Sequence, residues 1–188
     1  MINYKKIAKF IKDTRTLYVW NTEDMQYVCN GITVFPIFGM PKMSPMEILT
    51  FLGLADKAKD IMIHTDDAPE WLEDATFDKL DENLLERTGP CIVLDGNEYR
   101  TFYTERGAVI VRNAYLLVVE SSATDETPVI HCMLEMPGKT AVATFAGFEL
   151  YNITMPLSPK GLAAQYEVLA SQLHTAERQT KPESEEQT

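Results

Sequence analysis

The fold of this chain is decided by residues 91–157, which read CIVLDGNEYRTFYTERGAVIVRNAYLLVVESSATDETPVIHCMLEMPGKTAVATFAGFELYNITMPL. Runs of β-branched and aromatic residues alternate there with turn signals at residues 95–97, 106–107 and 137–139. Short turns of this kind join antiparallel strands, whereas parallel neighbours need crossovers of a dozen or more residues. The stretch therefore predicts a mainly antiparallel sheet. Its strands are expected at residues 98–104, 108–112, 115–120, 129–136, 140–145 and 148–155.

The N-terminal part of the chain predicts one helix followed by short strands. Tyr4, Ile7 and Ile11 recur at helical spacing, which indicates an amphipathic helix with its lysines toward solvent. Residues 16–20 and 26–29 then predict a β-hairpin. Residues 32–38 predict a third strand. Because Pro36 cannot donate to a strand ladder, this strand should lie at a sheet edge or end near the proline.

The central part of the chain predicts further helices. Ser44, Pro45 and Glu47 match a capping box with proline at the first helical position, so a helix should begin there. Gly53 should end or kink that helix before a second helical piece at residues 54–63. The acidic stretch 66–87 predicts two short helices or one irregular helix, which Gly89 and Pro90 terminate.

The C-terminal part of the chain predicts a helix and a polar tail. Ser158 and Pro159 repeat the helix-start signal, and an apolar stripe follows at Leu162, Tyr166, Leu169 and Leu173. Residues 178–188 are too polar to bury and are expected to be disordered. The sequence as a whole predicts an α+β fold with N-terminal, central and C-terminal amphipathic helices, in one domain over residues 1–177 with a possible subdivision near 88–90.

Composition excludes several classes of protein. The chain has 188 residues, a formal net charge of -11 and 45% hydrophobic residues. No apolar run reaches the roughly 18 to 20 residues that span a bilayer, and the N-terminus lacks the apolar core of a signal peptide. We therefore expect a cytoplasmic protein. Three cysteines without CxxC spacing do not predict a disulfide framework or a zinc knuckle.

Charge is distributed unevenly along this acidic chain. Residues 1–15 carry five basic side chains and one acidic one, whereas residues 66–87 carry nine acidic side chains and two basic ones. Helical geometry places Lys5, Lys9 and Lys12 on one side of the first helix. These three lysines are the candidate contacts for a polyanion or an acidic partner protein.

No stretch of the sequence carries a recognisable catalytic, cofactor-binding or metal-binding motif. The chain lacks a GxSxG elbow, an HExxH pair and the common phosphate-binding loops. His131 and Cys132 are adjacent in a predicted strand, so their side chains point to opposite faces and cannot form a dyad. The sequence assigns no catalytic residue, cofactor or metal ligand. It does offer a candidate partner surface at Met40, Met43, Tyr99 and Tyr103.

Three functions are compatible with these features. The first is a non-enzymatic protein that works by protein–protein binding or self-assembly. The second is a DNA-associated accessory factor that uses its basic helix as a sliding clamp does, an analogy of architecture alone. The third is an enzyme with carboxylate chemistry, which requires that two side chains of a set of four converge in a pocket. That set is Glu98, Glu120, Glu135 and Glu149.

Overall fold

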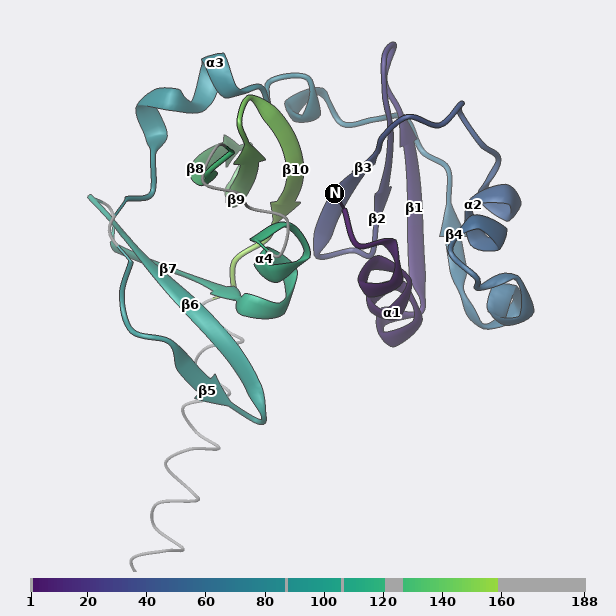
Figure 1. Cartoon of the computed structure of the whole chain (residues 1–188), viewed down its shortest axis with the longest axis horizontal. Helices are drawn as coiled ribbons and strands as arrows, with labels where there is room; N and C mark the ends of the chain where they lie inside the picture. The colour runs from purple at the N-terminus through teal and green to yellow at the C-terminus, as the bar shows by residue number, and fades with distance from the viewer. Residues whose placement is uncertain (1, 87, 106, 121–126, 159–188) are drawn as a thin grey trace, which may run out of the picture. The chain divides into compact units, whose positions relative to one another are not determined.

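A computed structural model describes residues 2–86, 88–105, 107–120 and 127–158 of the chain. The chain divides into two units, Met1–Pro156 and Leu157–Thr188, and the fold described below is that of the first unit. Helices combine with mainly antiparallel sheets, so the unit has an α+β fold (Figure 1). The predicted C-terminal helix and polar tail lie beyond the described residues.

The larger of two sheets has seven strands in the order β4-β1-β2-β3-β10-β9-β8. Their bounds are β1 Thr16–Asn21, β2 Gln26–Cys29, β3 Thr33–Ile37, β4 Met62–His64, β8 Val129–Met136, β9 Lys139–Ala146 and β10 Glu149–Thr154. Every neighbouring pair is antiparallel except β1 and β4, which are parallel. The predicted hairpin of the N-terminal part and the predicted strands of residues 129–155 are confirmed.

Strand β3 is not an edge strand, because it lies between β2 and β10. Its pairing with β10 covers only Thr33 and Val34, whereas its pairing with β2 extends through Pro36 to Ile37. The proline therefore stands where the strand has one partner, one residue before the strand ends. The expectation of an edge position was wrong, and the expectation that the strand ends near Pro36 is confirmed.

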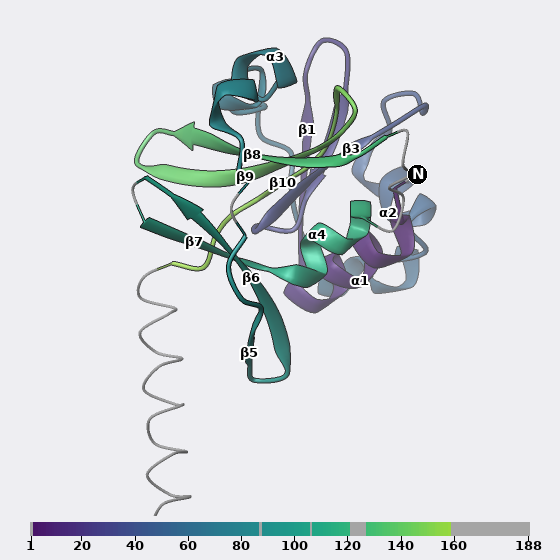
Figure 2. The same cartoon turned by 60° about the vertical axis from the view of Figure 1, so that its left-hand side comes forward.

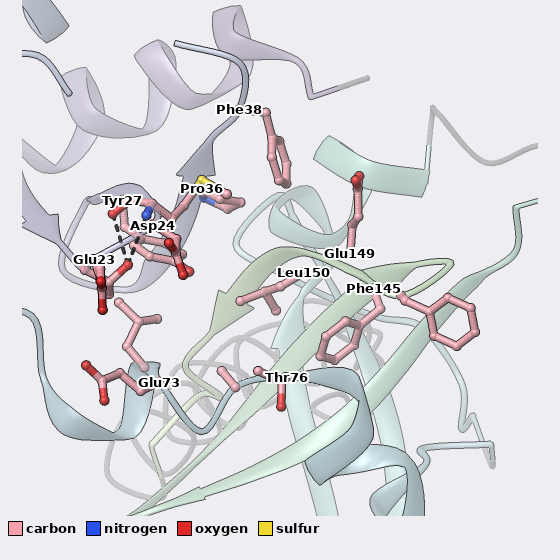
Figure 3. A pocket seen from close by; sticks show the side chains of 15 residues that line it. Glu23, Asp24, Tyr27, Pro36, Phe38, Glu73, Thr76, Phe145, Glu149 and Leu150 are labelled. Atoms are coloured by element: carbon pink, nitrogen blue, oxygen red, sulfur yellow. Dashed lines mark hydrogen bonds between the residues drawn. The ribbon is translucent and has the colours of Figure 1, made fainter. Parts of the chain in front are cut away.

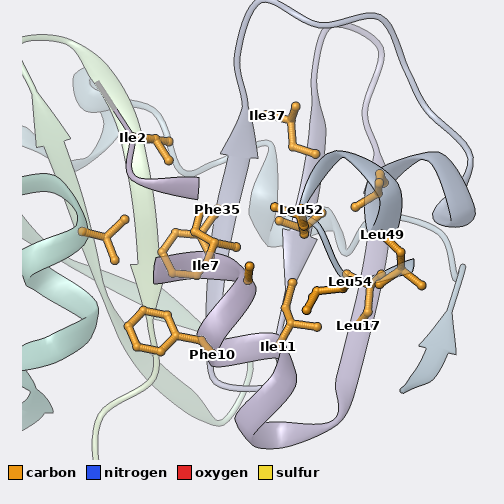
Figure 4. Close-up of a cluster of buried hydrophobic side chains, with 14 of the residues drawn as sticks. Ile2, Ile7, Phe10, Ile11, Leu17, Phe35, Ile37, Leu49, Leu52 and Leu54 are labelled. Carbon is orange, nitrogen blue, oxygen red and sulfur yellow. The ribbon is translucent and has the colours of Figure 1, made fainter. Parts of the chain in front are cut away.

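One face of the large sheet is covered by helices. Helix α1 (Tyr4–Thr14) buries Ile7, Phe10 and Ile11 against Leu17 and Phe35 of the sheet, and helix α2 (Pro45–Phe51) adds Ile48 and Leu49 to the same core (Figure 4). The predicted capping box is present at the start of α2. The Ser44 hydroxyl accepts from the Glu47 amide, and the Glu47 carboxylate accepts from the Ser44 amide.

The opposite face of the large sheet is covered by the acidic stretch. This stretch forms three short turns of helix, η2 (Glu70–Leu72), α3 (Phe77–Leu80) and η3 (Asp81–Asn83), in place of longer helices. Leu72, Ala75 and Leu80 pack there against Val34 and Phe145. The acidic side chains remain outside because only every third or fourth residue of the stretch meets the sheet.

The helix expected at residues 54–63 is shorter than predicted. A 3-10 helix, η1 (Ala55–Asp60), occupies its first part, and the remaining residues form the edge strand β4 beside β1. The amide of Met62 donates to the carbonyl of Arg15 at 2.9 Å, which begins this parallel pairing. Ladder bonds to β1 satisfy the backbone here, so the tertiary context outweighs the local helical pattern.

A smaller three-stranded antiparallel sheet contains β5 (Ile92–Leu94), β6 (Asn97–Thr104) and β7 (Gly107–Arg112). The predicted turn at residues 95–97 joins β5 to β6, with Leu94 paired to Asn97. Phe102 and Val111 of this sheet form a buried cluster with Leu116 and with Val142 of strand β9. This cluster holds the smaller sheet to the rest of the unit.

The strand predicted at residues 115–120 is a helix instead, α4 (Asn113–Glu120). The run AYLLVV is apolar throughout, and such a run fits a buried helix and a buried strand equally well. The fold resolves this ambiguity in favour of a helix, because Tyr115, Leu116 and Val118 are buried in two different core clusters. An extended strand would direct these residues to only two opposite faces.

The large sheet is built from two similar halves. Helix α1 is followed by the meander β1-β2-β3, and helix α4 is followed by the meander β8-β9-β10; the two meanders meet where β3 pairs with β10. The two helices lie side by side (Figure 2), since the rings of Phe10 and Tyr115 are 4.7 Å apart and the Lys6 Nζ atom donates to the Leu117 carbonyl at 3.0 Å.

Within the described residues, no helix has the length and apolarity required to cross a membrane.

Candidate functional site

The predicted cationic residues lie on the outer face of α1. Lys5, Lys9 and Lys12 are exposed, together with Asp13 on the same helix. Lys6 differs from them because it is half-buried and its amino group binds the Leu117 carbonyl. Three lysines are therefore available to an anionic partner, and the fourth lysine of the helix is committed to the fold.

The predicted methionine surface is only partly exposed. The side chain of Met40 is 44% exposed, whereas Met43 packs against the core beneath α1 and α2. The backbone of Met43 is held by the side chain of Gln26, which accepts from the Met43 amide at 3.0 Å and donates to its carbonyl at 2.9 Å. Met40 offers apolar area to a partner, and Met43 positions the loop.

The two predicted tyrosines have different environments. Tyr99 is 7% exposed and belongs to the interior, whereas Tyr103 is 46% exposed near the end of β6. A Cβ atom on Gly89 would lie 2.9 Å from the Tyr103 ring, so this ring rests directly on the glycine backbone. Tyr103 also borders a pocket of about 550 Å³ that Glu82, Glu86, Glu105 and Glu135 line.

Of the four carboxylates that the enzyme hypothesis needs together, the three with described side chains do not meet in either of the two pockets. Glu149 lines one pocket and Glu135 another, and Glu98 accepts a hydrogen bond from the Asn113 amide group at 3.1 Å. The side chain of Glu120 lies outside the described part of the structure. Among the described residues, no three His, Cys, Asp or Glu side chains are grouped to hold a metal ion.

A pocket of about 570 Å³ lies on the face covered by the acidic stretch, and we call it the acidic groove (Figure 3). Four separate segments line it. They are the β1–β2 hairpin, the end of β3 with Phe38, residues 72–76 and the β9–β10 turn. Its volume falls within the range of about 300 to 1,000 Å³ that is typical of ligand pockets.

The floor of the acidic groove is apolar. Its apolar lining residues are Tyr27, Pro36, Phe38, Leu72, Phe145 and Leu150. Phe148 stands at the edge with 79% of its side chain exposed, and its ring contacts Phe77 with centroids 5.3 Å apart. This ring adds exposed apolar area at the edge of the groove.

The rim of the acidic groove carries only negative charge. Glu23, Asp24, Glu73 and Glu149 line the groove, and no lysine, arginine or histidine is among its described lining residues. Within the described ranges, none of these four carboxylates forms an ion pair with a basic side chain. The amino group of Lys42 binds the Thr22 and Glu23 carbonyls beside this rim, so the groove combines apolar area with an excess of negative charge.

Burial and the carboxylates of the groove together raise the pKa of two tyrosines. Burial raises the pKa of Tyr27, and the carboxylate of Asp24 raises it further. Burial likewise raises the pKa of Tyr151, whose ring contacts Phe38, and the charge of Glu149 and a hydrogen bond to Glu149 add to the effect. Both phenols stay protonated near neutral pH and act as neutral hydrogen-bonding groups beside the groove.

The wall formed by the β1–β2 hairpin is fixed in place. The amino group of Lys42 donates to the carbonyls of Thr22 and Glu23, at 2.6 and 2.8 Å. Gln26 links the same hairpin to the following loop through its bonds to Asn21 and Met43. These contacts fix the backbone that carries Glu23 and Asp24, whereas the side chains of both residues are exposed.

The chain matches no protein-family model, and no curated protein or solved structure shows significant similarity to it.

Sequence reasoning missed the acidic groove. Of the residues that it selected as partner contacts, only Tyr103 lines either of the two pockets. The residues of the groove come from segments up to 128 positions apart in the sequence, and each segment alone looks like an ordinary turn. One signal was present in the sequence. Phe148 follows Gly147 at a turn, a position where small and polar residues are usual.

Proposed function

We propose that this chain is a non-enzymatic cytoplasmic protein that works by protein–protein binding, and that the acidic groove is the site that holds the partner. The observation that carries the proposal is the combination of an apolar floor, a rim of carboxylates without ion pairs among the described residues and the exposed ring of Phe148. Apolar area supplies binding free energy of roughly 25 cal/mol per Å² buried, and the charged rim supplies specificity.

The chemistry of the groove supports binding better than catalysis. Its carboxylates stand beside tyrosines that are neutral at physiological pH, and no serine, cysteine or histidine is among its described lining residues. Nucleophilic catalysis needs a serine, cysteine or threonine with a base in reach; the groove has Thr22 and Thr76, and the Thr22 hydroxyl donates to the Met25 carbonyl. The cytoplasmic location is supported by the three cysteines, all free, as is typical of a reducing compartment.

A random peptide display library, panned on the full chain, tests this function. Enriched peptides should bind the wild-type chain and lose binding to Phe148→Asp, and native mass spectrometry should report whether the chain also binds itself. A dimer that Phe148→Asp dissociates would assign the groove to self-assembly, the second form of the same function. Peptides that bind both chains equally, with a monomer in both cases, would refute a binding role for the groove.

A second candidate function is DNA association through α1. The exposed Lys5, Lys9 and Lys12 project from a helix that lies beside α4 over one sheet made of two meanders, which is the arrangement that a clamp-like use would need. Helix α4 contributes no lysine or arginine, so the basic surface comes from one helix only. This asymmetry makes DNA the weaker candidate.

Fluorescence anisotropy with a labelled DNA duplex tests the second candidate. If the three lysines contact phosphates, the logarithm of the binding constant should fall against the logarithm of salt concentration with a slope of about -3. Lys5→Glu, Lys9→Glu and Lys12→Glu together should abolish binding. The absence of binding at low salt would exclude DNA as the partner.

A further inference from the structure

We infer that the occupant of the acidic groove is a polypeptide segment in which one aromatic or large aliphatic side chain is flanked on both sides by lysine or arginine. This inference rests on the function proposed above and names the chemistry of the partner. It follows from the placement of the apolar and charged groups within the groove.

The apolar requirement comes from the floor. Leu72 and Phe145 are almost fully buried, yet each presents an edge to the groove, and Leu150 lies half-buried between them and the rim. The apolar surface that is open to the groove belongs to the half-buried Tyr27, Phe38 and Leu150, and a polar occupant would leave this surface and Phe148 in contact with water. An aromatic or aliphatic side chain inserted into the groove removes from water both the apolar surface of the groove and that of Phe148.

The cationic requirement comes from the four carboxylates. Held on fixed walls without a basic neighbour among the lining residues, they repel one another and any anionic ligand. Lysine and arginine also carry long aliphatic stems that can lie along an apolar surface while the charged end stays at the rim. A cation thus satisfies the rim and adds contact with the floor.

The flanking requirement comes from the positions of the carboxylates around the floor. In the view of Figure 3, Glu23 and Glu73 lie at one end of the groove and Glu149 at the other, with Leu150 between them. Glu23 belongs to the β1–β2 hairpin, whereas Glu149 begins β10. A segment with a cation on one side only would leave one of these ends unpaired.

A second copy of this chain does not meet these requirements through its basic helix. Lys5, Lys9 and Lys12 are exposed on α1, but the apolar residues of that helix are buried in its own core. The lysine face therefore offers charge without an apolar anchor. A separate partner protein meets both requirements.

Four labelled synthetic peptides test the inference by fluorescence anisotropy with the full chain. The first has a central tryptophan between two pairs of lysines. The others replace all lysines by glutamate, replace the tryptophan by alanine, or move all four lysines to one side of the tryptophan. The first peptide should bind at least about tenfold more tightly than each of the other three.

Two double variants of the chain that change the net charge equally distinguish attraction at the groove from attraction to the overall charge of the protein. The variant Glu73→Lys/Glu149→Lys should weaken binding of the first peptide by at least about tenfold, whereas Asp56→Lys/Asp60→Lys, on exposed positions of η1, should leave it within about twofold. Circular dichroism confirms that both variants fold. An equal loss in the two variants would overturn the inference, because the attraction would then be non-specific.

The outcomes also separate this inference from the function on which it rests. If the first and the glutamate peptides bind equally and both lose affinity for Phe148→Asp, the groove binds proteins but the cationic rule is wrong. If a self-association through the groove is found instead, the partner assigned here is wrong while the binding function stands. If no peptide responds to Phe148→Asp and the chain is monomeric, both proposals fail.

Discussion

Gln26 shows how one buried side chain can position a whole surface. The side chain is 4% exposed, and its amide group bridges Asn21 on one side and the Met43 backbone on the other. Because the donor Nε2 faces two acceptor oxygens, no residue other than glutamine satisfies all three bonds in this geometry. The rim of the acidic groove depends on this contact, although Gln26 does not line it.

Gln26→Glu should destabilise the chain by about 3 to 5 kcal/mol at neutral pH, because it places a buried carboxylate against two carbonyl-type oxygens. This environment raises the pKa of the new carboxyl in the folded state above its unfolded value of about 4.3. The free energy of unfolding of the variant should therefore fall as pH rises from about 4.3 toward the raised pKa of the folded state. Its loss of stability relative to the wild type should become smaller toward about pH 4. Urea unfolding measures both effects. Gln26→Met, which loses the bonds without adding charge, should show a deficit that does not depend on pH.

Gly89 is a second position where one atom decides local packing. An added Cβ would lie 2.9 Å from Tyr103 Cε2 and 3.1 Å from Thr101 Cβ, and the Gly89 amide donates to the Thr101 carbonyl at 2.8 Å. We expect Gly89→Ala to cost about 1 to 3 kcal/mol of unfolding free energy through overpacking. In a double-mutant cycle, Tyr103→Ala should recover part of that cost, since it removes the ring. Equal costs with and without the ring would place the conflict at Thr101 alone.

At the level of secondary-structure elements, the accuracy of prediction followed the locality of the signal. The capping box at Ser44 and the turn at residues 95–97 involve residues within a few positions of one another, and both were predicted. Strand β4 and helix α4 were not. Strand β4 forms because its backbone can pair with β1. Helix α4 is helical because its side chains are buried in two different core clusters. Neither partner is visible in the local sequence.

Helix α4 is stabilised at its C-terminal end by a residue far away in the chain. The carbonyl of Leu117 is among the last four of the helix, which have no partner within it, and Lys6 of α1 supplies a charged donor at 3.0 Å. We expect Lys6→Met to cost about 1 to 2 kcal/mol and to speed hydrogen exchange of the α4 amides. Lys5→Met removes the same charge from an exposed position and should leave the exchange of α4 unchanged. A matching acceleration in both variants would contradict a role for the hydrogen bond.

At the level of the whole molecule, the acidic groove is a consequence of topology. Its walls belong to both meanders and to the acidic stretch, which lies between the two meanders in the sequence. The groove therefore exists only when β3 and β10 are paired. The sequence indicated the strands and the excess of acidic residues. It could not indicate that Glu23 and Glu149 would border one hollow, because that depends on the order of strands in the sheet.

The same topology predicts that the two meanders unfold locally in one step. The reactivity of the cysteine thiols can measure this step. Cys29 of β2 and Cys132 of β8 are buried in one cluster, whereas Cys91 is exposed. Burial raises the pKa of Cys29 from 9.0 to about 11, partly offset by a hydrogen bond from the Gly31 amide. At pH 8 a disulfide reagent should therefore modify Cys91 rapidly, and Cys29 and Cys132 should react slowly and at one common rate, since one opening exposes both.

Cys91→Ser is the control for this measurement, because it should remove the rapid phase and leave the slow one. Because the folded state keeps the Cys29 proton up to higher pH than the unfolded state does, this thiol should lower stability as pH rises from about 9 to about 11. Separate slow rates for Cys29 and Cys132 would show that the two meanders open independently. The pairing of β3 with β10 would then be too weak to maintain a groove built from both.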